Sequence, residues 1–169
     1  MNVFTKYLTL FGIAMVPLIE LRGALPVAYV YKAADPSFNL IWAYIVIAIG
    51  NMLPVPFIFF FARKVLEWGA KSNIPIINKF FAWCLEKGHK GGEKLQAKAG
   101  RGLFVALMLF VGIPLPGTGA WTGTLAASLL DMKFKDSVLA VVCGVILASV
   151  IVGVLCTLGL GAWFGITGQ

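Results

Sequence analysis

Two stretches of the chain are continuously apolar over the length of a membrane-crossing helix. No charged residue occurs from Phe38 to Ala62, and none occurs from Ser137 to Gln169. A bilayer core about 30 Å thick is crossed by a helix of about 20 apolar residues. The pattern therefore predicts one transmembrane helix in each stretch, with a glycine-rich tail after the second.

Two other apolar regions are each interrupted near their centre. The region Val3 to Tyr31 contains the sequence PLIELRGALP, and the region Leu103 to Leu130 contains GIPLPGTGAWTG. Proline removes a backbone donor and clashes with the preceding turn, so neither region forms one regular helix. We expect two half-helices around each break, as in a re-entrant hairpin, because such backbone survives at membrane depth only beside protein or a water-filled cavity. Hydropathy leaves open the alternative of two short, tilted crossings.

A basic, amphipathic segment separates the two halves. Residues 64–101 combine Lys and Arg with three Glu and place apolar residues at helical spacing, which predicts an interfacial linker. Its basic excess predicts a cytoplasmic location. We expect an all-α integral membrane protein with a single domain, residues 1–169, composed of repeat one (1–63), this linker and repeat two (102–169). If each hairpin returns to its own side, the repeats are inverted, as in secondary transporters with a midplane site.

Composition excludes the soluble globular classes. The chain is 60% hydrophobic and 12% charged, whereas soluble domains carry about 25% charged residues. Its net charge of +7 lies mostly beside the apolar segments, so anionic lipid headgroups are the expected partner rather than nucleic acid. The expected location is the inner (cytoplasmic) membrane, with several passes.

The first break places two opposite charges in an apolar region. Glu20 and Arg22 would each cost several kcal/mol if they faced lipid, so they pair or face water. In a structural interpretation, an ion pair within or across the hairpins pins the turn. In a functional interpretation, the planar fork of Arg22 binds an anionic group, and Glu20 takes up and releases a proton because dehydration favours its neutral form.

The second break has no ionisable group, so binding there depends on backbone and hydroxyl groups. Glycines allow successive N–H groups to form an anion nest, and a half-helix that follows adds its positive end. Close packing through small residues is the alternative. The predicted substrate-binding residues are Arg22, Gly117, Thr118, Gly119, Trp121 and Thr122. The candidate cavity-lining residues are Asn51, Pro26, Pro114 and Pro116.

No metal site, cofactor or enzymatic centre is expected. Cys84, Cys143 and Cys156 form no CxxC pair, and His89 is the only histidine, so we interpret the cysteines as packing residues. The sequence also lacks a Ser/His pair, an HExxH motif and paired intramembrane aspartates.

The motifs ELRGALP and GIPLPGTGAWTGTLAASLL, on either side of one basic linker, resemble those of the small multi-drug export protein family over nearly the whole chain. That family is grouped with the DedA-like (VTT-domain) membrane proteins. The resemblance implies two re-entrant hairpins facing each other across the bilayer, and movement of undecaprenyl phosphate or other phospholipids between leaflets with proton or sodium coupling. It assigns Glu20 and Arg22 to the first hairpin and the stretch from Gly117 to Gly123 to the second. The second hairpin lacks the arginine of the DedA-like relatives, and the nearest preceding basic residue is Arg101.

These observations favour a transporter or flippase for an anionic lipid such as undecaprenyl phosphate, with ion coupling at Glu20. One alternative is a proton-coupled exporter of small cationic drugs, in which Glu20 is the cation and proton site and Arg22 opposes binding. A second alternative is a non-transporting membrane assembly factor. A homodimer is expected, because four short membrane elements bury little surface alone.

Overall fold

The computed structural model describes residues 2–71, 78–79, 82, 101–115 and 117–159. Within these residues the regular structure is helical and no strand occurs, which confirms the all-α prediction. The helices are α1 (Val3–Met15), α2 (Glu20–Ala34), α3 (Leu40–Met52), α4 (Pro54–Ala70), α6 (Arg101–Gly112), α7 (Ala120–Leu129) and α8 (Phe134–Thr157). Several residues discussed above lie outside the described part of the chain: Cys84, His89, Pro116 and the tail beyond residue 159.

Both stretches that the sequence predicts to cross the membrane form helices. The stretch Leu40–Phe61 has 22 residues and a mean hydropathy of 2.0, and Phe134–Thr157 has 24 residues and a mean hydropathy of 3.0. By length and composition, both are able to cross a membrane. The first is divided into α3 and α4 only by Leu53, whose backbone is helical and whose N–H donates to the Ile49 carbonyl (3.0 Å). Since α4 continues to Ala70, the predicted linker begins inside this helix.

Both interrupted regions consist of two helices around a break, as expected. The chain leaves α1 after Met15 and enters α2 at Glu20, and it leaves α6 after Gly112 and enters α7 at Ala120. The first break is shorter than the motif PLIELRGALP suggests, because Pro26 is buried inside α2. Proline there removes one donor, the N–H that would pair with the Arg22 carbonyl, and the helix continues because its other turns are packed.

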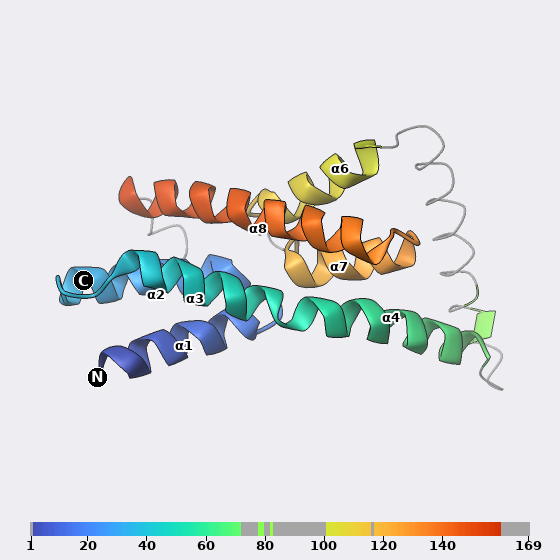
Figure 1. Ribbon diagram of the computed structural model, residues 1–169, viewed down its shortest axis with the longest axis horizontal. Helices are drawn as coiled ribbons and strands as arrows, with labels where there is room; N and C mark the ends of the chain where they lie inside the picture. Colours follow the sequence, from blue (N-terminus) through green and yellow to red (C-terminus); the bar gives the residue numbers. More distant parts are fainter. Residues whose placement is uncertain (1, 72–77, 80–81, 83–100, 116, 160–169) are drawn as a thin grey trace.

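The two hairpins enter the molecule from opposite ends and meet in its middle (Figure 1). The first helix of each hairpin packs on the long helix of its own half, α1 on α3 and α6 on α8. The second helix packs on the long helix of the other half, α2 on α8 and α7 on α4. The turns of the hairpins therefore lie beside each other, about midway along the long helices.

Glycines allow close approach where α8 crosses α3. A Cβ added to Gly153 would lie 2.2 Å from the Tyr44 hydroxyl oxygen and 3.5 Å from that of Tyr29. The two hydroxyl groups are themselves hydrogen-bonded at 3.1 Å. This contact holds α2, α3 and α8 together.

We expect Gly153→Ala to lower the free energy of unfolding by about 1–3 kcal/mol, the usual cost of overpacking, because the Tyr44 ring must move and weaken its bond to Tyr29. Thermal unfolding of the purified protein in detergent micelles measures the effect. Gly12→Ala is the matched control, since nothing lies within 4 Å of its added Cβ. There the better helix propensity of alanine should stabilise the protein by up to about 1 kcal/mol. Equal melting temperatures for the two variants would contradict the assigned contact.

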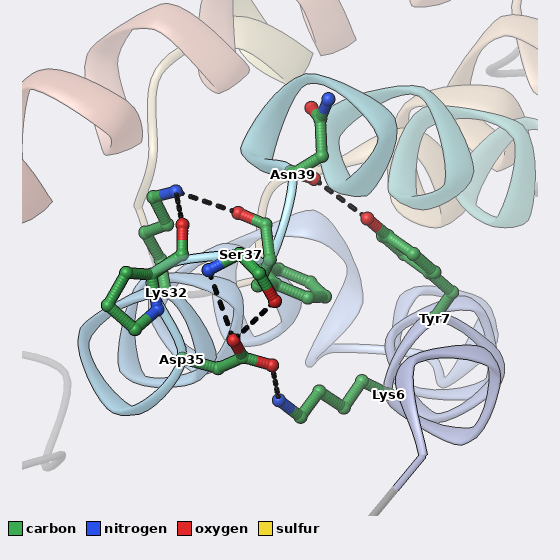
Figure 2. A network of polar contacts seen from close by, with 8 residues as sticks. Lys6, Tyr7, Lys32, Asp35, Ser37 and Asn39 are labelled. Atoms are coloured by element: carbon green, nitrogen blue, oxygen red, sulfur yellow. Dashed lines mark hydrogen bonds and ion pairs between the residues drawn. The ribbon is translucent and has the colours of Figure 1, made fainter.

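A polar cluster closes the base of the first hairpin (Figure 2). The Lys6 ammonium forms an ion pair with Asp35 at 2.8 Å and lies 5.6 Å from the centre of the Phe38 ring, although Lys6 is only 9% exposed. Beside it, the Tyr7 hydroxyl donates to the Asn39 carbonyl at 3.0 Å. The cluster thus connects the start of α1 to the loop between α2 and α3.

Asp35 remains charged in this cluster over the whole neutral pH range. A hydrogen bond from Lys6, followed by bonds from the Ser37 hydroxyl and N–H, lowers the Asp35 pKa to about 2. Because the pKa is lower in the folded state, the resulting stabilisation is present above the ordinary aspartate pKa. It is lost only as the pH falls towards 2.

Candidate functional site

The candidate site is the contact between the two breaks, which we call the hairpin junction. It comprises residues 16–22 of the first hairpin and residues 111–115 and 117–121 of the second. Its polar side chains are those of Glu20, Arg22, Thr118 and Trp121.

Glu20 caps the N-terminus of α7. Its carboxylate accepts the Ala120 N–H at Oε2 and the Trp121 N–H at Oε1, both at 3.1 Å. The first N–H groups of a helix have no partner within the helix and form its positive end. This environment accounts for a carboxylate that is only 3% exposed.

The absence of a side chain at Gly119 leaves the space that the Glu20 carboxylate occupies. A Cβ at this position would lie 2.2 Å from Oε2 of Glu20 and 2.8 Å from Oε1. In addition, its φ of 146° and ψ of −172° belong to a region that is essentially restricted to glycine. Both the contact and the backbone therefore require glycine here.

Arg22 caps the opposite helix terminus, the C-terminal end of α6. Its Nη2 donates to the carbonyls of Val111 (3.3 Å) and Ile113 (3.1 Å) and to Oγ1 of Thr118 (2.8 Å), while Nη1 donates to the Thr118 carbonyl. The last carbonyls of a helix lack partners within the helix and form its negative end. The first hairpin thus supplies the cation that the second break lacks.

Each charge at the junction therefore faces the helix end of opposite sign. Among the described side chains, Lys6 and Asp35 form an ion pair, and no ion pair joins Glu20 to Arg22. The structural interpretation expected an ion pair that pins the turn. The two charges instead connect the hairpins through hydrogen bonds to the backbone. These bonds also explain how two charges are accommodated in an apolar region.

The turn that presents Glu20 has an unusual backbone. Leu18 and Glu20 have positive φ values, 71° and 49°, a conformation that costs non-glycine residues on the order of 1 kcal/mol each. Such backbone persists where its surroundings enforce it, and the α7 N-terminus does so by binding the Glu20 carboxylate.

The remaining predicted substrate-binding residues lie along the second break. Thr118 is central, since its hydroxyl lies 2.9 Å from the carbonyls of both Ile113 and Leu115. Thr122 turns its hydroxyl to the Gly119 carbonyl, 3.5 Å away. Gly117 is exposed, with nothing within 4 Å of an added Cβ.

Two nitrogen atoms at the junction are buried without a hydrogen-bond partner in the described part of the chain. They are Nε of Arg22 and Nε1 of Trp121. The side chains are half-buried, and each of these atoms can only donate. The junction therefore contains two hydrogen-bond donors that bond to no acceptor among the described residues.

The candidate cavity-lining residues that the structure describes lie in three different elements. Pro114 is half-buried in the second break, and Pro26 is buried in α2. Asn51, at the end of α3, is 2% exposed, and its Oδ1 has no partner among the described residues. An apolar recess of about 290 Å³ lies on α4. Its lining residues are Pro56, Phe57, Phe60, Phe61 and Lys64.

Sequence reasoning missed the backbone partners of the two charges. The carbonyls of Val111 and Ile113 and the N–H of Ala120 belong to ordinary apolar residues. The signal that was available is the break itself, because each helix that ends at a break leaves unpaired backbone groups. The Lys6–Asp35 pair was also missed, although Lys6 is the only charge in the first apolar run before Glu20.

Two helices able to cross a membrane, with paired hairpins packed on them, define a helical, membrane-associated protein. The chain belongs to the family described as "Putative small multi-drug export protein", whose model matches residues 20–151. The match includes Glu20, Arg22 and the second break, and the family's description suggests a transporter for small multi-drug export. No curated protein and no solved structure matches it.

Proposed function

We propose that this protein moves an anionic amphiphile, such as undecaprenyl phosphate or another phospholipid, between the leaflets of the inner membrane, with ion coupling at Glu20. The observation that carries the proposal is the surplus of donors at the hairpin junction, Nε of Arg22 and Nε1 of Trp121. Buried donors are satisfied by a ligand that accepts hydrogen bonds, and phosphate oxygens are strong acceptors.

The family description favours a second candidate, the export of small cationic drugs. A cation would need a carboxylate whose oxygens are available. Both oxygens of Glu20 already accept N–H groups of α7, and the Arg22 guanidinium in the same junction repels cations. The geometry therefore favours an anionic ligand.

We further propose that both hairpins are re-entrant. Two exposed tryptophans, Trp42 and Trp68, mark the ends of the long α3–α4 stretch, and tryptophan concentrates at membrane interfaces. Their separation in sequence corresponds to about 39 Å of helix, close to the thickness of a bilayer with its headgroup regions.

Contacts along this stretch support a position of the hairpin turns near mid-depth. Gly50 lies against Phe11 and Ala14 at the end of α1, about 12 Å along the helix from Trp42. On the other side, the Ser128 hydroxyl of α7 donates to the Phe59 carbonyl at 3.0 Å, about 14 Å from Trp68. The junction then lies between the levels of Gly50 and Phe59.

The packing also supports an inverted repeat, because α1 and α6 occupy equivalent places on α3 and α8, and α2 and α7 equivalent places on α8 and α4. In such transporters paired broken segments form the site at the repeat interface. The position of Arg22 at the second break supports the grouping with DedA-like proteins, since it places an arginine where the second hairpin has none of its own. In this proposal the protein is a multi-pass carrier rather than an enzyme.

A reconstituted leaflet-translocation assay tests the proposal. Vesicles with and without the purified protein carry a fluorescent phosphatidylglycerol, phosphatidylcholine or cationic lipid analogue, and a membrane-impermeant quencher reports exchange between leaflets. We expect at least about tenfold faster translocation of the anionic lipid than of the others, which corresponds to about 1.4 kcal/mol of discrimination. Equal rates for all three lipids, or rates no higher than in empty vesicles, would refute it. The latter result would favour an assembly factor, and selective movement of the cationic analogue would favour drug export.

A further inference from the structure

The Glu20 carboxylate occupies the position at the α7 N-terminus that an anionic ligand would take. We infer that Glu20 is a built-in occupant of the anion site, so that the anionic substrate binds when Glu20 is protonated and the proton and the anion travel together. This inference rests on the proposed function. It adds the direction of coupling, which is symport.

The geometry leaves room for one anionic group. The two oxygens of Glu20 use the N–H groups of both Ala120 and Trp121 at 3.1 Å. The same oxygens fill the space above Gly119, at 2.2 Å and 2.8 Å from the position of a Cβ. A second anion beside the ionised carboxylate would lack these donors and would be repelled strongly in a region of low dielectric constant.

Protonation changes the carboxylate from an acceptor into a group that also donates. One oxygen of the neutral acid carries a hydrogen and keeps only part of its acceptor capacity, so its bond to an N–H of α7 is weaker. Bonds to the remaining oxygen are weaker because charge-assisted hydrogen bonds are about twice as strong as neutral ones. The α7 N-terminus is then available to an anionic oxygen.

The hairpin junction contains further donors that an incoming anion can use. Trp121 contributes its indole Nε1, and Arg22 contributes its Nε, both buried without partners among the described residues. Arg22 meanwhile keeps its terminal nitrogens on the α6 carbonyls and Thr118. The anion is thus bound without dismantling the α6 cap.

No other charge at the junction competes with Glu20 for this role. On its own helix the neighbouring charge is Arg22, which stays protonated, and α7 has no ionisable side chain. Lys6 and Tyr7 of α1 bond to Asp35 and the Asn39 carbonyl, and Tyr44 of α3 bonds to Tyr29. The ionisable residues of α8, which packs on α2, are Lys135, Asp136, Cys143 and Cys156.

The coupling follows from charge balance. A proton from the aqueous phase binds the Glu20 carboxylate, and one singly charged anion enters from the same side, so the net charge of the junction is unchanged. Release reverses both events on the other side: the anion leaves, Glu20 loses its proton and its carboxylate binds α7 again. No bond other than that of the transferred proton forms or breaks.

Binding of a short-chain phosphatidylglycerol to the purified protein tests this inference. A phosphodiester keeps one negative charge across the neutral range, whereas a phosphate monoester titrates there. We expect the wild-type affinity to fall with rising pH, by up to about tenfold per unit. Glu20→Gln should bind independently of pH and, at the alkaline end, at least about tenfold more tightly. Asp35→Asn, which removes a half-buried carboxylate at the base of the first hairpin, should retain the wild-type slope.

A second readout works with the wild-type protein alone. In vesicles with a trapped pH-sensitive dye, an imposed gradient of the phosphatidylglycerol should move protons in the same direction as the lipid. Failure of both proteins to bind the lipid at any pH would contradict the proposed function. Binding by a folded Glu20→Gln variant that is weaker than wild type, or that keeps the wild-type pH slope, would overturn only the present inference, as would proton movement against the lipid.

Discussion

We expect an Arg22→Ala variant to lose leaflet translocation and a large part of its stability. Arg22 is the donor to the carbonyls of Val111, Ile113 and Thr118, and each buried group that loses its partner costs about 1–3 kcal/mol. We therefore expect a total loss of about 3 kcal/mol. Because the guanidinium also holds the two hairpins in register and presents Nε to the ligand, translocation should fall by at least about 100-fold, the equivalent of about 2.7 kcal/mol. Thermal unfolding in micelles and the vesicle assay measure the two effects.

Lys32→Ala is the matched control for this prediction. Lys32 is also a cation that donates to backbone carbonyls, those of Pro36 (2.7 Å) and Phe38 (2.9 Å), but it is exposed and lies at the base of the first hairpin. Since water replaces these bonds, its loss should cost less than about 1 kcal/mol and leave translocation nearly unchanged. If the two alanine variants behaved alike, Arg22 would have no special role at the junction.

We expect Gly119→Ala to be the most damaging single-carbon change in the second hairpin. Its added Cβ would lie 2.2 Å from Oε2 of Glu20, so the carboxylate must leave its two N–H donors or α7 must shift. Overpacking of this kind costs about 1–3 kcal/mol, and the glycine-only backbone adds about 1–3 kcal/mol of strain. Unfolding in micelles should begin at a clearly lower temperature, and translocation should lose its dependence on pH because Glu20 no longer occupies α7.

Gly117→Ala separates strain from contact. Gly117 also has a positive φ, 81°, but an added Cβ there meets nothing within 4 Å. It should cost only the backbone strain of about 1 kcal/mol and keep the pH dependence of translocation. The assignment of Gly119 as the floor of the carboxylate site would be wrong if Gly117→Ala were as damaging, or if Gly119→Ala retained the wild-type pH profile.

Much of the fold was predictable because the bilayer restricts what a chain can do. Uninterrupted apolar stretches of sufficient length predicted the helices Leu40–Phe61 and Phe134–Thr157. Proline and glycine in the other two regions predicted that each divides into two helices, since proline removes a donor from the helical ladder. The exact limits were less predictable. Pro26 lies inside α2 because a packed helix tolerates the loss of one bond, whereas the actual turn precedes Glu20 and contains strained, non-glycine residues.

The sequence alone determined that two breaks occur, one with Glu20 and Arg22 and one with glycines and threonines. It also determined that neither charge is left facing lipid, because an unpaired charge there costs several kcal/mol. Only the tertiary structure decided what satisfies them. The two charges form hydrogen bonds with backbone atoms about 90 to 100 positions away in the sequence. These bonds depend on how the two hairpins meet, and the side chains of the partner residues do not reveal them. The charges therefore bind the helix ends of the opposite hairpin rather than each other, and Glu20 binds the N-terminus of the helix that follows the glycines of the second break.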